Sequence, residues 1–284
     1  MIGIDMNHSP VSLGSIDIGI DPNLISIGPY DLSWHGLFVV LAVIVGVGWP
    51  AYWAKRAGIS RDMVYSIAMW AVPGGIVGAR LVHVLDDVDF YFNNPGQVFD
   101  FWEGGVSIYG AILGGIIAAF LYAKLRGLPF NRLADLTAPG IILAMAVGRI
   151  GCTINGDAYG TPTSLPWGLV YTHQDAFAAP GVAGHPAPVY EILWDLVVFA
   201  VVWRLRGRLK PAGALLLFYL ALYSFGRFFI SFVREEPERL GPLHEAHLIA
   251  LLVMAITVPL LIYGASREKA RLQALATEDG SEGQ

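Results

Sequence analysis

Apolar stretches of about 20 residues recur along this chain, and each is long enough to cross the roughly 30 Å hydrocarbon core of a bilayer as a helix. Seven membrane-spanning helices are predicted: 34–54, 64–85, 104–123, 133–153, 189–205, 212–233 and 246–264. Composition agrees, because 55% of the 284 residues are hydrophobic and only 14% are charged, whereas soluble domains are about one quarter charged. The sequence therefore predicts an all-α integral membrane protein.

Lysine and arginine residues predict the orientation of these helices, because positive charge accumulates in cytoplasmic loops. Basic residues follow the first, third, fifth and seventh spans: Lys55, Arg56, Arg61, Lys124, Arg126, Arg132, Arg204, Arg206, Arg208, Lys210, Arg267, Lys269 and Arg271. Residues 1–33 and the segment 155–188 contain none. The loop with Arg234 and Arg239 is an exception, and acidic residues accompany them there.

This distribution of basic residues predicts on which side of the membrane each end of the chain lies. We expect an extracytoplasmic N-terminal segment 1–33 and a seven-helix transmembrane domain 34–265, which contains the extracytoplasmic segment 155–188. A cytoplasmic, solvated tail, residues 266–284, is expected to follow the last span. The N-terminus is therefore predicted to be extracytoplasmic and the C-terminus cytoplasmic.

Three arginines fall inside the expected spans: Arg80, Arg149 and Arg227. An arginine at the centre of a membrane helix costs about 2.5–3.5 kcal/mol on insertion scales, so such residues usually face a partner, a polar cavity or a functional site. All three are expected in the outer half of the bilayer, at the level where three other polar side chains enter it: His35, Tyr109 and Glu191. Such a layer suits an anionic lipid of the outer leaflet, because a guanidinium fork can hold two phosphate oxygens. For Arg80 a purely structural pairing is an equal alternative.

Other kinds of site are only weakly indicated. A net charge of −5 gives no case for nucleic-acid binding. The single cysteine, Cys152, is expected to be a small packing residue, and the acidic residues 86, 87 and 89 near His83 are expected to be solvated. We therefore predict no metal and no cofactor. Glycine pairs at 74–75, 104–105 and 114–115 would permit close helix contacts.

The segment GRIGCTINGDAYG, residues 148–160, resembles the signature of the bacterial prolipoprotein diacylglyceryl transferases, Gly-Arg-x-Gly-Asn-Phe-x-Asn-Gly-Glu-x-x-Gly. Further stretches occur in the order of that family: ISIGP, LSWHGL, GARL, GGVSIYGAILGG, ADLTAP, HPAPVYE and FGRFFISFVREEP. The resemblance covers most of residues 25–265. It implies a transferase of the bacterial cytoplasmic (inner) membrane with its active site toward the extracytoplasmic side.

The implied reaction moves the diacylglyceryl group of phosphatidylglycerol onto the lipobox cysteine thiol of a preprolipoprotein, which forms a thioether and releases glycerol 1-phosphate. The implied partners are phosphatidylglycerol, the signal peptide with its lipobox, and membrane lipid. By this resemblance Arg149 and Arg227 are catalytic and contact the lipid phosphate. Further positions correspond to the family pattern, with Asp157 standing where the family often has glutamate. They are expected to bind or surround the substrate: Arg80, Asn155, Asp157, Gly160, His185 and Glu191.

Three positions depart from the family pattern. Cys152 replaces an asparagine, Tyr109 stands where well-known members have a histidine, and His35 stands where they commonly have a tyrosine. We hypothesise that the imidazole has changed helix, so that His35 is the general base or its hydrogen-bonded relay and Tyr109 orients the substrate. Tyr109 as the base stays an alternative.

Two other functions are left open. The departures would also fit a paralogue that is inactive or altered in specificity. A membrane transporter with a lipid-anion site is a second alternative, although it would favour an internal repeat of short or broken helices, and none is seen.

Overall fold

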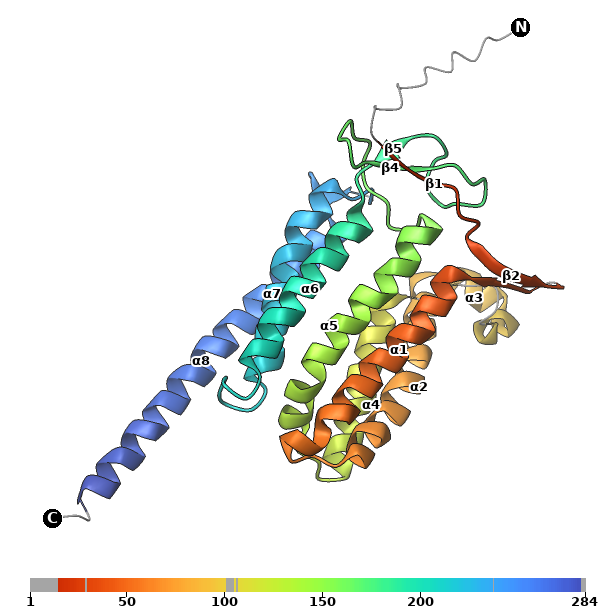
Figure 1. Cartoon of the computed structure of the whole chain (residues 1–284). Helices are drawn as coiled ribbons and strands as arrows, with labels where there is room; N and C mark the ends of the chain where they lie inside the picture. The colour runs from red at the N-terminus through yellow and green to blue at the C-terminus, as the bar shows by residue number, and fades with distance from the viewer. Residues whose placement is uncertain (1–14, 29, 101–104, 106, 237, 282–284) are drawn as a thin grey trace, which may run out of the picture. The chain divides into compact units, whose positions relative to one another are not determined.

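A computed structural model describes residues 15–28, 30–100, 105, 107–236 and 238–281. The chain divides into two compact units, which are described separately: Met1–Gly46 with Thr137–Gln284, and Val47–Leu136. The α-helices are α1 (Trp34–Trp53), α2 (Arg61–Asp86), α3 (Val88–Asn93), α4 (Ile108–Leu125), α5 (Phe130–Asn155), α6 (Ala187–Leu205), α7 (Ala214–Ile230) and α8 (Glu245–Ser281) (Figure 1). Short 3-10 helices are η1 (Ala54–Ala57), η2 (Pro95–Phe99) and η3 (Ser231–Val233).

Six helices among the described residues are long and apolar enough to cross a membrane: Trp34–Ala57, Arg61–Asp86, Ile108–Leu125, Phe130–Asn155, Ala214–Val233 and Glu245–Leu275. The prediction of a mostly helical, multi-pass membrane protein is therefore confirmed. The remaining expected span, 189–205, corresponds to α6, a helix of 19 residues. Helix α6 carries three charged residues within its length, Glu191, Asp195 and Arg204. A count of seven spans and the orientation of the termini stay predictions.

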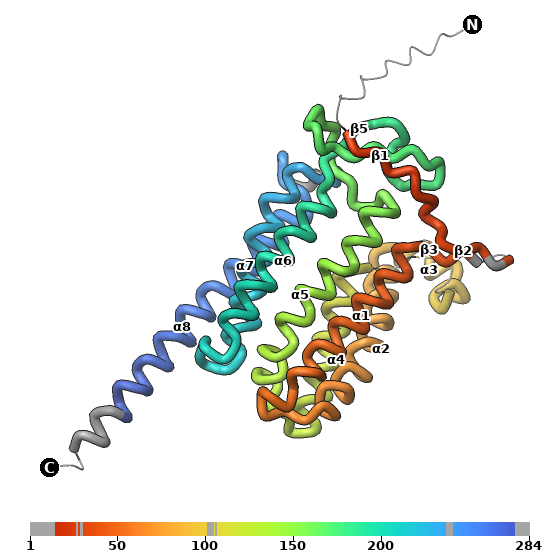
Figure 2. Tube along the Cα trace, in the orientation of Figure 1, coloured from red at the N-terminus to blue at the C-terminus, as the bar shows by residue number. Residues whose placement is uncertain are grey.

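Several helix ends differ from the expected ones for local reasons. Helix α4 begins at Ile108 rather than at residue 104, because the Ser107 hydroxyl caps it by accepting a hydrogen bond from the Gly110 N–H at 3.5 Å. Helix α8 continues to Ser281, past the expected end of the last span at residue 264, through a stretch rich in strong helix formers. Figure 2 shows α8 extending past the connection between α6 and α7.

Short strands refine the all-α prediction. They lie outside the predicted spans, in the N-terminal segment and in connections between helices: β1 (Ile16–Ile18), β2 (Asn23–Ile27), β3 (Tyr30–Ser33), β4 (Leu169–Tyr171), β5 (Ala183–Gly184), β6 (Glu238–Leu240) and β7 (Leu243–His244). Strand β4 pairs in parallel with β1 and antiparallel with β5. This small sheet ties the segment between α5 and α6 to the chain before α1.

Helices α6, α7 and α8 lie side by side in the first unit (Figure 1). A core cluster of buried side chains comes from α5, α6 and α7: Ala138, Ile142, Val198, Val202, Leu215 and Tyr219. Trp194 of α6 lies against Gly226 of α7, where an added Cβ atom would overlap the indole nitrogen. That nitrogen donates a hydrogen bond to the Leu222 carbonyl at 3.2 Å. This contact brings Glu191, one turn before Trp194, close to Arg227, which follows Gly226.

Helices α2 and α4 pack through glycines in the second unit. An added Cβ atom on Gly78 would overlap the carbonyl oxygen of Gly110, and one on Gly114 would overlap that of Gly74. Backbones can approach this closely only where side chains are absent. The close contacts predicted from the glycine pairs 74–75 and 114–115 are therefore confirmed, whereas residue 104 lies outside the described residues.

We expect Gly78→Ala to destabilise the protein by about 1–3 kcal/mol, because the added methyl group forces α2 and α4 apart. Thermal unfolding in detergent measures the loss. Gly48→Ala is the matched control, since Gly48 is also helical and an added methyl group there would meet nothing within 4 Å. Equal unfolding temperatures for the two variants would contradict the close packing of α2 on α4.

Candidate active site

A single buried carboxylate joins three arginines in the first unit. The Glu191 side chain is only 4% exposed and pairs through Oε2 with Arg149 Nε. Its Oε1 atom accepts hydrogen bonds from Arg227 Nη1 at 2.5 Å and from Arg234 Nη1 at 3.1 Å. The three arginines come from α5, from α7 and from the segment after η3. Arg149 and Arg227, which the sequence predicts to be site residues from their positions inside the membrane, thus both contact Glu191.

Glu236 completes this arginine cluster, which consists of Arg149, Glu191, Arg227, Arg234 and Glu236. Arg227 Nη2 donates a hydrogen bond to Glu236 Oε1 at 2.8 Å, and Arg234 Nε lies 3.1 Å from the same oxygen. Among these five residues, three guanidinium groups face two carboxylates, so the ion pairs of the cluster leave one positive charge in excess. Because these side chains are at most 21% exposed, the excess charge is poorly screened by water and can attract an anion.

Arg234 and Glu236 are not among the predicted site residues. Burial and the neighbouring Arg227 lower the pKa of Arg234, whereas Glu191 and Glu236 raise it. An arginine stays charged under such shifts, and so it needs these acidic partners. Arg234 could have been found from the sequence, because it lies in the one loop that departs from the pattern of basic residues. There a basic residue followed by two glutamates indicates local ion pairing.

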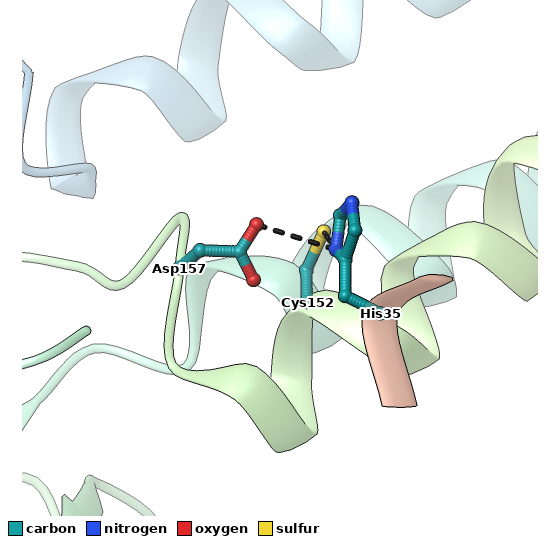
Figure 3. A group of neighbouring side chains, drawn as sticks. All are labelled: His35, Cys152 and Asp157. Atoms are coloured by element: carbon teal, nitrogen blue, oxygen red, sulfur yellow. Dashed lines mark hydrogen bonds and ion pairs between the residues drawn. The ribbon is translucent and has the colours of Figure 1, made fainter. Parts of the chain in front are cut away.

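Arg149 also contacts a second set of polar side chains, which lie near the end of α5. Arg149 Nη1 donates a weak hydrogen bond to Cys152 Sγ at 3.8 Å, and that sulfur lies 3.7 Å from His35 Nδ1. The same nitrogen lies 3.4 Å from Asp157 Oδ2 (Figure 3). Helix α1 reaches α5 closely at Gly151, where a Cβ atom would be 2.9 Å from the His35 Cα atom. Cys152, expected as a packing residue, is therefore part of a polar chain between Arg149 and Asp157.

The segment after α5 carries other predicted residues and is held to the arginine cluster by backbone contacts. Gly160 N–H donates to the His185 carbonyl at 3.0 Å, and residue 160 also bridges to Arg234. A Cβ atom at Gly160 would lie 2.5 Å from the Val233 carbonyl oxygen, so only glycine fits there. Asn155 is buried at the end of α5, and its carbonyl accepts from the Phe177 N–H.

His185 and Tyr190 hold the start of α6. His185 Nδ1 lies 3.4 Å from the Tyr190 hydroxyl, which also accepts a hydrogen bond from the Trp167 indole at 2.8 Å. These contacts anchor the segment between α5 and α6 beside the turn that presents Glu191. Both side chains therefore support the start of α6.

Arg80 and Tyr109 belong to the second unit. Arg80 is 5% exposed and donates hydrogen bonds to the carbonyls of Val98 and Gly105, both at 2.9 Å, and of Gln97. These bonds hold η2 and Gly105 against α2, which favours the structural alternative for Arg80. Tyr109 lies in the first turn of α4 and is 39% exposed.

Fold and site define a multi-pass helical membrane protein with a buried, net positive cluster of arginines and glutamates. The sequence profile of the family described as prolipoprotein diacylglyceryl transferase matches residues 22–263. This chain therefore belongs to that family. The matched region includes the whole arginine cluster.

Bacterial relatives are similar over most of their length, and each bears the name phosphatidylglycerol–prolipoprotein diacylglyceryl transferase. The protein of Trichormus variabilis is 40% identical over 241 residues, which cover 81% of this chain and 84% of the relative. That of Clostridioides difficile is 38% identical over 222 residues, or 78% and 86% of the two chains. That of Dehalococcoides mccartyi strain CBDB1 is 36% identical over 254 residues, or 89% and 97%.

Proposed function

We propose that this protein transfers the diacylglyceryl group of phosphatidylglycerol to the lipobox cysteine thiol of preprolipoproteins. The observation that carries the proposal is the arginine cluster, in which Arg149 and Arg227 converge on buried Glu191 with one positive charge in excess. An anionic phosphate diester compensates that charge. Family membership supplies the identity of the lipid and of the protein substrate.

Arg149 and Arg227 stabilise the leaving group. In the reaction the substrate thiolate attacks the glyceryl carbon, a C–S bond forms, and the C–O bond to the phosphate breaks. Negative charge develops on the departing glycerol 1-phosphate, and guanidinium groups fixed beforehand bind it more strongly than they bind the diester. Glu191 and Glu236 hold the guanidinium groups in position.

His35 accepts the thiol proton, since the thiolate and not the thiol is the nucleophile. Asp157 Oδ2, 3.4 Å from His35 Nδ1, favours the tautomer in which Nδ1 carries the proton. Nε2 is then the acceptor. In Figure 3 this second ring nitrogen lies on the side away from Asp157 and Cys152.

The direct test incubates the purified protein in detergent with phosphatidylglycerol and a lipobox peptide and then weighs the peptide. We expect the mass of one diacylglyceryl group to be added and glycerol 1-phosphate to be released. A peptide with serine in place of the lipobox cysteine is the control and should gain nothing. If the Trichormus variabilis relative modified the peptide while this protein did not, the inactive-paralogue alternative would replace the proposal.

The choice of base gives a paired prediction. We expect His35→Phe to lower turnover by about 100-fold or more, the usual contribution of general base catalysis, and Tyr109→Phe to affect it less. Both are assayed with saturating phosphatidylglycerol across about pH 6 to 9. Loss of turnover in Tyr109→Phe alone would make Tyr109 the base and would reject the exchange of the imidazole between helices.

Localisation in the bacterial inner membrane, with the active site toward the extracytoplasmic side, gives a labelling prediction. A thiol reagent that cannot cross membranes should label Thr172→Cys, but not Leu209→Cys, in cells stripped of any outer membrane. Both should be labelled after detergent opens the cells. The native Cys152 is buried and contributes little background. The reverse pattern would invert the predicted orientation.

A further inference from the structure

His35, Cys152 and Asp157 form a compact group of three different metal-ligand types, here called the His–Cys–Asp group (Figure 3). Their ligand atoms all lie within 4.8 Å of one another. The Cys152 Sγ to His35 Nδ1 distance is 3.7 Å, and the His35 Nδ1 to Asp157 Oδ2 distance is 3.4 Å. Tetrahedral zinc with ordinary bond lengths to sulfur, nitrogen and oxygen separates its ligands by about 3.4–3.6 Å. These two separations therefore need almost no adjustment to hold such an ion.

A second observation points to a ligand at this place. Asp157 Oδ1 is buried, and within the described part of the chain it has no hydrogen-bond partner. Buried carboxylate oxygens are normally satisfied, so one without a partner calls for an explanation. The side chains of His35 and Asp157 are 38% and 32% exposed, which leaves access from outside. A cation within reach of both carboxylate oxygens of Asp157 would give Oδ1 the partner that it lacks.

Charge and ligand softness select the kind of ion. A thiolate and a carboxylate supply two negative charges, and a neutral imidazole adds a nitrogen ligand. Thiolate and imidazole ligands favour zinc and similar transition metals over magnesium or calcium, which prefer oxygen. Arg149 Nη1, 3.8 Å from the sulfur, opposes a cation, but its own charge is countered by Glu191.

We propose that the His–Cys–Asp group binds a divalent transition-metal ion of the zinc type, and that the bound ion inhibits the transferase. Three protein ligands leave the fourth tetrahedral position open. With the ion on Nδ1, the neutral imidazole carries its proton on Nε2, so no lone pair is left to accept the substrate thiol proton. Binding itself is independent of the proposed function, whereas inhibition rests on it.

Binding is tested by titrating the purified protein in detergent with cobalt(II) chloride. A thiolate ligand gives cobalt a strong charge-transfer absorption in the near ultraviolet, and Cys152 is the chain's one cysteine. We expect this absorption to saturate at one ion per chain and to bleach when zinc chloride displaces cobalt. Asp157→Asn should weaken binding by more than the roughly 10–100-fold that loss of an outer ligand partner costs. No absorption in the wild type, or unchanged affinity in Asp157→Asn, would overturn the proposal.

A matched control comes from the same unit. Asp21, His173 and Asp175 also lie close together, but they lack a thiol and Asp21 and Asp175 are exposed. His173→Phe should leave the cobalt absorption unchanged. Gel filtration of each variant shows whether it has kept its fold. If His173→Phe removed the absorption as Asp157→Asn does, the assignment to the His–Cys–Asp group would be rejected.

Inhibition is tested by the ratio of transfer rates with and without zinc chloride. We expect zinc to lower wild-type transfer at least tenfold and a chelator to restore it, whereas the ratio for Cys152→Ala stays near one whatever its own rate. The lipobox thiol binds zinc equally in both reactions, so it cannot produce the difference. Equal ratios, or stimulation by zinc, would overturn the inhibition. A cobalt-binding protein with no transferase activity would instead reject the proposed function alone.

Discussion

Replacing Arg149 with alanine is expected to lower diacylglyceryl transfer by at least about 100-fold, the usual cost of removing one fixed donor to a developing negative charge. Arg149 pairs with Glu191 through Nε and reaches Cys152 through Nη1, so its guanidinium is held between Glu191 and the His–Cys–Asp group. Arg149→Lys should recover little, because an ammonium group cannot hold two phosphate oxygens in one plane. The measurement is the rate of mass gain of the lipobox peptide.

Arg126→Lys is the control for this substitution, because Arg126 is exposed in the connection between α4 and α5. It should retain the wild-type rate. Near-normal turnover in Arg149→Lys would show that a single positive charge suffices, and the bidentate role of Arg149 would then be wrong.

Glu191→Gln is expected to destabilise the protein by about 3–5 kcal/mol and to remove transfer activity. The substitution deletes a carboxylate that contacts three arginines, and it leaves Glu236 as the one acidic partner of the cluster. Buried charges that lose their partner repel one another and are poorly solvated, which is costly even where the intact pair adds little net stability. Thermal unfolding in detergent measures this loss.

Two further variants separate this effect from a general loss of negative charge. Glu235→Gln is the matched control, because Glu235 is exposed beside the cluster and should be nearly neutral. Adding Arg234→Gln to Glu191→Gln removes one of the unpaired positive charges and should restore part of the lost stability, a non-additive result expected for residues in contact. An unchanged unfolding temperature for Glu191→Gln would contradict the ion-pair account.

Local sequence is sufficient to predict that the chain is a helical membrane protein and to identify some of the site residues. In lipid every backbone polar group must be bonded within its own segment, so an apolar run of about 20 residues becomes a helix whatever surrounds it. Arg149 and Arg227 can be selected because a charge in such a run is costly and needs a reason. The glycines of α2 and α4 can be selected because helices approach closely only where side chains are missing.

Pairing between distant segments cannot be predicted in this way. Nothing near Arg234 in the chain indicates that its guanidinium contacts Glu191 of α6. From the sequence alone, Arg234 is only a basic residue in a loop that is expected to have none. Cys152 is expected to be a packing residue because the substrate itself supplies the reacting thiol, yet its sulfur lies between Arg149 and His35.

Helical periodicity tells which residues share a face of one helix, and so it can place Arg149 and Cys152, one turn apart, on the same side of α5. It carries no information on which face of another helix lies opposite. That choice depends on the packing of whole helices, such as the fit of Trp194 over Gly226 that brings Glu191 to Arg227. The apolar pattern by itself therefore determined a membrane protein with buried arginines, and only the tertiary structure decided which side chains those arginines meet, because such contacts are made between segments far apart in the chain.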